Sequence, residues 1–301
     1  MPSQIILFDQ SRSASHLLAK VLSKQPKLEK LQSLYSACRG KQVEWLTSDD
    51  WENGMAEADY SAFKASARTA TAAWQEALLL TNCSQDKILL IHDHPFSSAH
   101  PEHVQSFINS SSTIPSIPEN FTSIPDTLLL HPNTIPILTI RDCLAVPSAY
   151  RVLTSFDFSH GSGRPNFLIS TTLVWQRRLY DFFCSHGVQP MVIDADDIMT
   201  DPGYCRFVCQ KLGLEPGLVC LEWEKFTEEE KAKIHPMLYA SQMELLESTG
   251  LDASRAAINV YFVVKEKKWE DEFGDDVPMV REMVESGIPH YQYLRERRLR
   301  M

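Results

Sequence analysis

The segment Ile5–Leu18, Ile-Ile-Leu-Phe-Asp-Gln-Ser-Arg-Ser-Ala-Ser-His-Leu-Leu, determines how this chain is expected to fold. An apolar run passes into a polar turn and then into an amphipathic segment, which predicts a strand, a tight loop and a helix capped by Ser15. A helix start exposes N–H groups that favour an anion, and Arg12 adds a forked, charged donor that suits phosphate or sulfate. The loop lacks the lysine and glycines of the nucleotide-hydrolase phosphate loop. The turn therefore either binds an anion or is an ordinary connection.

Length, charge and cysteine content narrow the class of protein. The 301 residues can bury a sizeable core, and we expect a single domain over residues 1–301. The net charge of −10 disfavours nucleic acid and membrane surfaces as partners. No apolar run is long enough to span a bilayer, and a strand that begins near Gln4 leaves no room for a secretory signal. The seven cysteines contain no Cys-x-x-Cys pair, which fits reduced thiols, so we expect a cytoplasmic protein.

Short apolar runs predict a parallel sheet. Strands are expected at Gln4–Asp9, Lys87–His92, Ile135–Ile140 and Met191–Asp194. Short buried strands that alternate with helices predict an α/β fold of three layers, in which helices cover both faces of a central parallel sheet.

The segments between and after these strands are expected to be helical. The region Lys27–Asn82 is predicted to be mostly helical, and Asn166–His186 is predicted to form one long amphipathic helix. The part of the chain from Pro202 to Met301 is predicted to be mainly helices.

Polar residues follow three of the predicted strands. Ser11–Ser15, His92–His94 and Arg141 lie at strand ends that meet at the same edge of a parallel sheet. The two histidines are therefore functional, or a polar strand end that bonds locally, or two metal ligands for which no third ligand presents itself. Arg141 either binds an anion or caps the neighbouring helix.

Together, these three motifs resemble those of the sulfotransferase family, which has a P-loop-like fold. Residues 11–18 resemble the loop Pro-Arg-Ser-Gly-Ser/Thr-Thr-x-Leu, which holds the 5′-phosphosulfate of the donor 3′-phosphoadenylyl sulfate. Ile91–Pro95 resembles Lys-Thr-His-Leu-Pro, in which the histidine is the catalytic base. Ile140–Asp142 with Pro147–Arg151 resembles the element whose arginine and serine bind the 3′-phosphate. The resemblance extends over nearly the whole chain and is strongest with fungal sulfotransferase-like proteins of small-molecule metabolism.

The resemblance implies a set of site residues and no metal. His94 would take a proton from the acceptor hydroxyl, while His92 and Arg12 would stabilise charge on the transferring group. The donor would be held by Ser11, Arg12, Ser13, Ala14, Ser15, His16, Arg141 and Ser148.

Four departures from the family pattern affect the donor site. Ala14 stands where the family has a glycine, His16 replaces a hydroxyl residue, and His92 replaces a lysine. Ser148 follows Arg141 by one residue fewer than usual, which turns it by about 100° on a helix.

The sequence therefore leaves three hypotheses. The first is a sulfotransferase-fold enzyme that transfers a sulfuryl group from 3′-phosphoadenylyl sulfate to a hydroxyl of a small metabolite. The second is a lyase, cyclase or isomerase of secondary metabolism that uses histidine acid/base chemistry without the sulfate donor. The third is an anion- or nucleotide-binding scaffold without turnover. The acceptor and the oligomeric state stay open.

Overall fold

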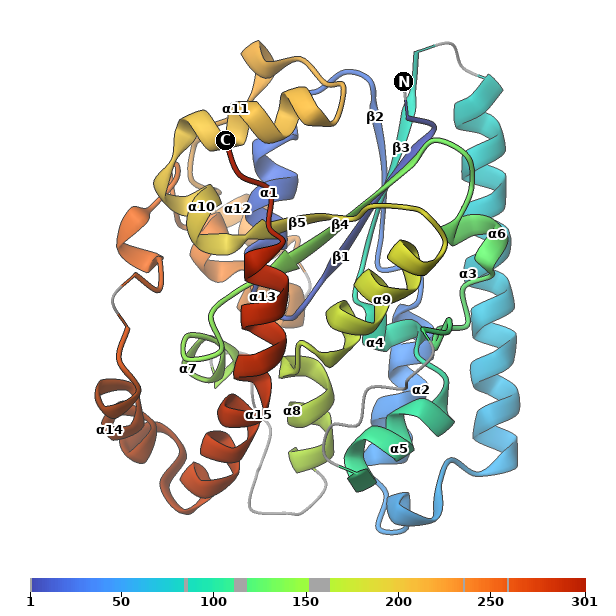
Figure 1. Cartoon of the computed structure of the whole chain (residues 1–301), viewed down its shortest axis with the longest axis vertical. Coiled ribbons are helices and arrows are strands. Elements are labelled where there is room, and N and C mark those ends of the chain that lie inside the picture. Colours follow the sequence, from blue (N-terminus) through green and yellow to red (C-terminus); the bar gives the residue numbers. More distant parts are fainter. Residues whose placement is uncertain (1, 84–85, 111–117, 152–162, 235, 259) are drawn as a thin grey trace.

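The protein is built around a five-stranded parallel sheet (Figure 1). The computed structural model describes residues 2–83, 86–110, 118–151, 163–234, 236–258 and 260–301. The strand order is β2-β3-β1-β4-β5, and all four pairings are parallel. The strands are β1 (Gln4–Asp9), β2 (Leu28–Gln32), β3 (Ile88–Asp93), β4 (Thr134–Ile140) and β5 (Met191–Asp194). The predicted α/β class and its four strands are confirmed.

The strand β2 was not predicted, and the expectation of helix over that part of the chain is wrong. Its sequence, Leu-Glu-Lys-Leu-Gln, is half-exposed or exposed at every position. It lies at the edge of the sheet and pairs only with β3 among the described strands. An edge strand with so little buried surface has no continuous apolar run, and such a run was the signal used for the other strands.

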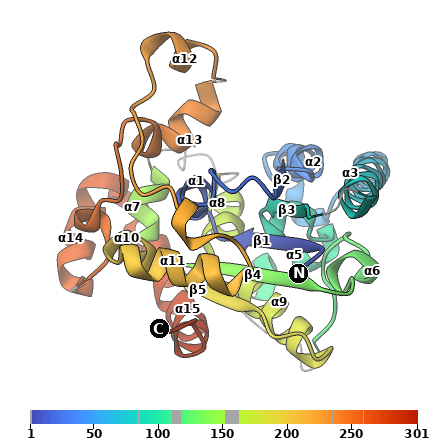
Figure 2. The same cartoon turned by 90° about the horizontal axis from the view of Figure 1, so that it is seen from above.

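Helices lie on both sides of the sheet (Figure 2). Alternate residues of β1 enter two separate cores: Ile6 and Phe8 pack in one, Ile5 and Leu7 in the other. This alternation is the period-2 pattern of a strand buried on both faces. The α-helices are α1 (Ser15–Val21), α2 (Ser36–Leu46), α3 (Glu57–Cys83), α4 (Pro95–Ser98), α5 (Pro101–Ser110), α6 (Asp126–Leu129), α7 (Val146–Arg151), α8 (Gly163–Thr171), α9 (Val174–Ser185), α10 (Ala195–Thr200), α11 (Pro202–Lys211), α12 (Glu228–Ala232), α13 (Pro236–Leu246), α14 (Phe262–Phe273) and α15 (Val277–Glu296). Short 3-10 helices are η1 (Trp51–Asn53), η2 (Pro216–Leu218), η3 (Ala253–Arg255) and η4 (Gly274–Asp276).

The single helix predicted over Asn166–His186 is two helices, α8 and α9. The chain turns at Thr172, whose hydroxyl oxygen accepts a hydrogen bond from the Val174 N–H at 3.1 Å. The indole of Trp175 donates to the carbonyl of Ile169 at 2.8 Å across the same corner. A threonine that accepts from the backbone two residues on offers the chain an alternative to a continuing helix.

The described part of the chain contains no helix that is long and apolar enough to cross a membrane.

A buried amide ties the start of β1 to its neighbours. The Gln4 side chain is fully buried and donates to the carbonyl of Leu128 at 2.7 Å and to the hydroxyl of Thr134 at 2.8 Å. Its oxygen accepts from the indole N–H of Trp74 on α3 at 2.9 Å. One side chain therefore joins β1, β4, α3 and α6.

We expect Gln4→Leu to lower the free energy of unfolding by about 2–4 kcal/mol, because it leaves the buried indole donor of Trp74 unpaired and removes the bonds to Leu128 and Thr134. Urea denaturation measures the change. Gln105→Leu, which removes a partly exposed amide from the described surface, is the control and should stay within about 0.5 kcal/mol of the parent chain. Equal losses in the two variants would contradict the role of Gln4.

Candidate active site

A cavity of about 600 Å³ opens where β1, β3 and β4 end. Its floor is formed by residues that follow these strands, among them Asp9, His94 and Arg141. Its other wall comes from the end of α13 and the segment after it, residues 242–255. The predicted convergence of three strand ends on one cleft is therefore observed.

The β1–α1 loop, residues 10–14, has an unusual backbone. Arg12 and Ala14 both adopt the left-handed conformation, with φ of 70° and 61°. For a residue with a Cβ this costs roughly 1–2 kcal/mol, so the surrounding contacts must hold the loop in place. One such contact is the hydroxyl of Ser13, which donates to the carbonyl of Gln10 at 2.7 Å and lies 2.7 Å from the hydroxyl of Thr139 on β4.

The prediction that Ser15 caps α1 is wrong. Ala14 occupies the cap position and provides no side-chain hydrogen bond. The Ser15 hydroxyl points the other way and donates to Oδ2 of Asp9. A buried carboxylate is a stronger acceptor than the alternatives within reach, so the serine hydroxyl is recruited to that charge.

Asp9, at the end of β1, is the buried charge of the site. Only 1% of its surface is exposed. Its Oδ1 lies 2.8 Å from Nδ1 of His94 and 3.6 Å from Nε2 of His92. Burial raises the pKa of the Asp9 carboxyl, but the charge of His94 and the two histidine contacts outweigh it and hold that pKa well below its ordinary range. Asp9 is therefore ionised at neutral pH.

His94 is the histidine that faces the cavity. Its side chain is 34% exposed and its ring stacks on Phe96, with centroids 4.9 Å apart. Burial by itself lowers the pKa of His94, yet the charge of Asp9 and the contact with it raise the pKa to about 9. At neutral pH, His94 is accordingly a protonated imidazolium paired with Asp9.

His92 lies behind His94, next to His16. His92 is buried and does not line the cavity, and its ring meets that of His16 edge-on with centroids 4.9 Å apart. Burial, and then the neighbouring charge of His92, lower the pKa of His16 to about 4. His16 thus lines the cavity as a neutral group.

Three arginines meet on the opposite side of the cavity. Arg141 donates to the carbonyl of Arg12 at 3.1 Å and to the carbonyl of Arg255 at 2.8 Å. The carboxylate of Glu244 on α13 lies 3.3 Å from Nη2 of Arg12 and 2.8 Å from Nη1 of Arg255. Within the described chain, Nε of Arg141 is buried and has no hydrogen-bond partner. Such an arrangement is suited to an anion with several oxygens.

Most of the residues predicted for the site line this cavity, and three do not. The lining residues are Ser11, Arg12, Ala14, Ser15, His16, His94 and Arg141. Ser13 and His92 are buried beneath it. Ser148 is not brought to the cavity: its hydroxyl donates to Glu272 on α14. This placement agrees with the shortened Arg141–Ser148 spacing, which turns the serine side chain away on α7.

The sequence reasoning missed Asp9, Arg255 and Glu244. Asp9 is the last residue of its strand, and an acidic residue at a strand end expected to meet the end that carries His92 and His94 was a usable signal. Arg255 and Glu244 belong to the segment after α11, where no motif marks either residue. Only the path of the chain brings them to the strand ends.

Two curated fungal proteins are similar to this chain. Both are described as sulfotransferase ppzF, one from Metarhizium rileyi and one from Metarhizium majus, and each is 35% identical over 195 residues. The resemblance to sulfotransferases is thereby confirmed. The match covers 60% of this chain and 57% of each relative, so the chain spans little more than half the length of the relatives it matches.

A solved structure is also similar to this chain. The sulfotransferase domain from the Synechococcus PCC 7002 olefin synthase matches 91% of this chain and 94% of its own, with a TM-score of 0.39 and 16% identity. No family model matches the chain.

The contact between Asp9 and His94 predicts a specific pKa change. In Asp9→Asn the pKa of His94 should fall from about 9 toward its ordinary 6.5, because the charge that raises it is gone. NMR titration of the imidazole signals measures it, with His103 on α5 as the internal control.

The same contact predicts a pH dependence of stability. A histidine whose pKa is raised on folding stabilises the folded chain fully below pH 6.5 and loses that contribution as the pH rises through about 9. Asp9→Asn should remove this alkaline loss. An unchanged His94 titration in a folded variant would contradict the assignment.

Proposed function

We propose that this chain is a cytoplasmic enzyme of small-molecule metabolism that transfers a sulfuryl group from 3′-phosphoadenylyl sulfate to a hydroxyl of a small acceptor. The observation that carries the proposal is the convergence of His94 with Arg12, Arg141 and Arg255 on one cavity. The similarity to fungal proteins described as sulfotransferases supports it. Nucleic acid and membranes are not part of the proposed function.

The residues around the cavity fit an anionic nucleotide donor. Arg12 and the β1–α1 loop would hold the 5′-phosphosulfate, and Arg141 would bind the 3′-phosphate through its unpartnered Nε. Arg255 adds a third guanidinium beside it. The methyl of Ala14 lines the same wall, so the loop offers the donor less room than a glycine would. When bound, the donor supplies a sulfuryl group activated by its bond to phosphate.

His94 would move the proton of the acceptor. With Asp9 at Nδ1, its other nitrogen, Nε2, is available for the acceptor hydroxyl. As the new oxygen–sulfur bond forms, the sulfur–oxygen bond to the phosphate breaks and the hydroxyl proton passes to Nε2. Adenosine 3′,5′-bisphosphate then leaves, with its negative charge stabilised by Arg12. His94 must enter this reaction neutral, because a protonated ring has no lone pair with which to accept.

A second candidate function follows from the same pKa. A His94 that is protonated at neutral pH is ready to donate a proton. This favours a lyase, cyclase or isomerase whose substrate occupies the cavity without sulfate. The arginines would then bind a carboxylate or phosphate of that substrate.

The pH dependence of the reaction rate distinguishes the two candidate functions. Sulfuryl transfer should rise with pH and level off above about 9, the pKa of His94, because the neutral base is needed. Acid catalysis should fall across the same range. Transfer of labelled sulfate from 3′-phosphoadenylyl sulfate to a panel of small phenols and alcohols measures the first directly.

Two substitutions test the roles of His94 and Arg12 directly. His94→Ala should lower turnover by roughly 10²–10⁴ and leave thermal unfolding nearly unchanged. Arg12→Ala should weaken the binding of adenosine 3′,5′-bisphosphate by about 1.5–3 kcal/mol. His186→Ala, just after the end of α9 and outside the cavity lining, is the control for histidine loss. Full turnover in His94→Ala, or a parent chain that neither binds the bisphosphate nor transfers sulfate, would contradict the proposal.

A further inference from the structure

We infer that Glu244 is a specificity-determining residue: its carboxylate occupies the position that an anionic ligand would take and competes with that ligand for Arg12 and Arg255. This inference rests on the proposed function, since it concerns the ligand of the same cavity. Its consequence is that the site admits a polyanion and discriminates against neutral and singly charged ligands.

The contacts of Glu244 are those that a bound anion would make. A single oxygen, Oε2, lies 3.3 Å from Arg12 and 2.8 Å from Arg255. These two guanidiniums belong to segments more than 240 residues apart, and the carboxylate is a shared counter-ion between them. A phosphoryl or sulfuryl oxygen that reached Arg12 would enter the same space.

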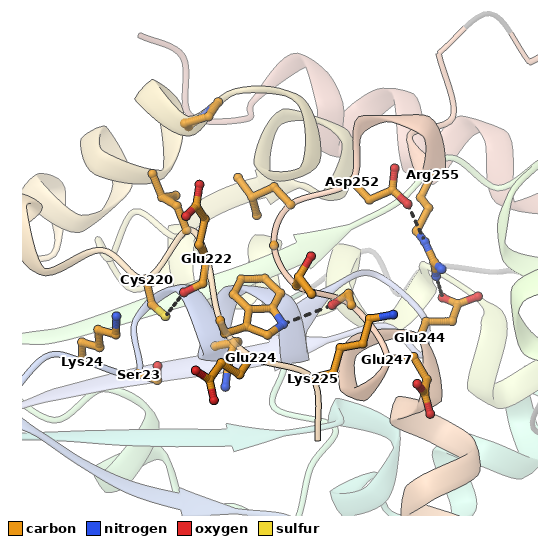
Figure 3. Close-up of a pocket in the computed structure, with 18 of the residues that line it drawn as sticks. Ser23, Lys24, Cys220, Glu222, Glu224, Lys225, Glu244, Glu247, Asp252 and Arg255 are labelled. Carbon is orange, nitrogen blue, oxygen red and sulfur yellow. Dashed lines mark hydrogen bonds and ion pairs between the residues drawn. The ribbon is translucent and has the colours of Figure 1, made fainter. Parts of the chain in front are cut away.

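Glu244 stands at the boundary between two cavities. A second cavity of about 1400 Å³ lies between α1, α11 and the segments 220–225 and 244–255, and it shares Glu244, Ser248, Gly250, Asp252 and Arg255 with the first. Figure 3 shows the carboxylates of Glu244 and Asp252 on either side of the Arg255 guanidinium. In Figure 2, α13 stands out from the layers of the sheet beside α1, so Glu244 reaches the site from a projecting element.

The difference in burial between Arg12 and Glu244 favours ligands with more than one negative charge as replacements for the Glu244 carboxylate. The side chain of Arg12 is only 11% exposed, whereas that of Glu244 is 45% exposed. The carboxylate can therefore move into water, whereas the buried charge of Arg12 is stabilised by an anion in the place of that carboxylate. A singly charged ligand merely replaces one carboxylate. A ligand with two anionic groups also reaches the unpartnered Nε of Arg141, and it binds with a net gain.

The test is the affinity for adenosine 3′,5′-bisphosphate, measured by calorimetry at physiological salt. Glu244→Gln removes the competing charge and keeps the shape of the side chain. We expect it to bind the bisphosphate about three- to tenfold more tightly than the parent chain, the range expected for loss of a half-exposed ion pair. Its thermal unfolding without ligand should be unchanged or lower, and the neutral probe adenosine should show no gain.

Glu224→Gln is the matched control. Glu224 lines the second cavity, is exposed, and forms no ion pair with the described residues. The substitution Glu224→Gln changes the net charge by the same amount as Glu244→Gln but breaks no contact with an arginine. The affinity of this variant for adenosine 3′,5′-bisphosphate should therefore change less than about twofold.

The outcomes separate this inference from the proposed function. Equal gains in affinity for the bisphosphate in Glu244→Gln and Glu224→Gln would mean a general charge effect. Weaker binding in Glu244→Gln would mean that Glu244 has a structural role. Either result overturns the inference. If the parent chain binds the bisphosphate, Arg12→Ala weakens it and Glu244→Gln brings no gain, the inference fails and the proposed function stands. If no variant binds the bisphosphate, both fail.

Discussion

The buried carboxylate of Asp9 is the interaction on which the rest of the site depends. A buried ionised group needs partners in fixed places, and among the described residues Asp9 has His94, His92 and the hydroxyl of Ser15. These contacts join the end of β1 to the end of β3 and to the first residue of α1. The charge therefore fixes the histidines and the entry to α1 together. It also explains why Ser15 does not cap its helix.

The opposite wall of the cavity is formed by arginines whose positions depend on contacts with each other and with Glu244. Arg12 takes its left-handed backbone at the tip of the β1–α1 loop, and Arg141 secures it through the carbonyl. Glu244 then bridges Arg12 and Arg255 from a projecting helix. One wall of the cavity thus carries His94, which can transfer a proton, and the other wall carries the arginines, which can bind an anion. A group-transfer reaction of an anionic donor requires both within one cavity.

Sequence predicted the sheet and one half of the site, for identifiable reasons. Buried strands such as β1 and β3 are continuous apolar runs, and the polar residues that follow them mark the strand ends. The edge strand β2 carries charge along its length and escaped that signal. Ser148 was assigned from a motif whose spacing differs by one residue, and a helix turns such a difference into a different direction. Arg255 and Glu244 depend on tertiary contacts alone, which no local pattern encodes.

The central claim is that an anionic nucleotide binds between these two walls, beside His94. An NMR titration of the imidazole signals with adenosine 3′,5′-bisphosphate tests it most directly, because His94 lines the cavity and His103 lies outside it. The account predicts saturable shifts of the His94 signals with no change at His103, and loss of these shifts in Arg12→Ala. Absence of binding, or binding that leaves His94 unperturbed, would contradict it.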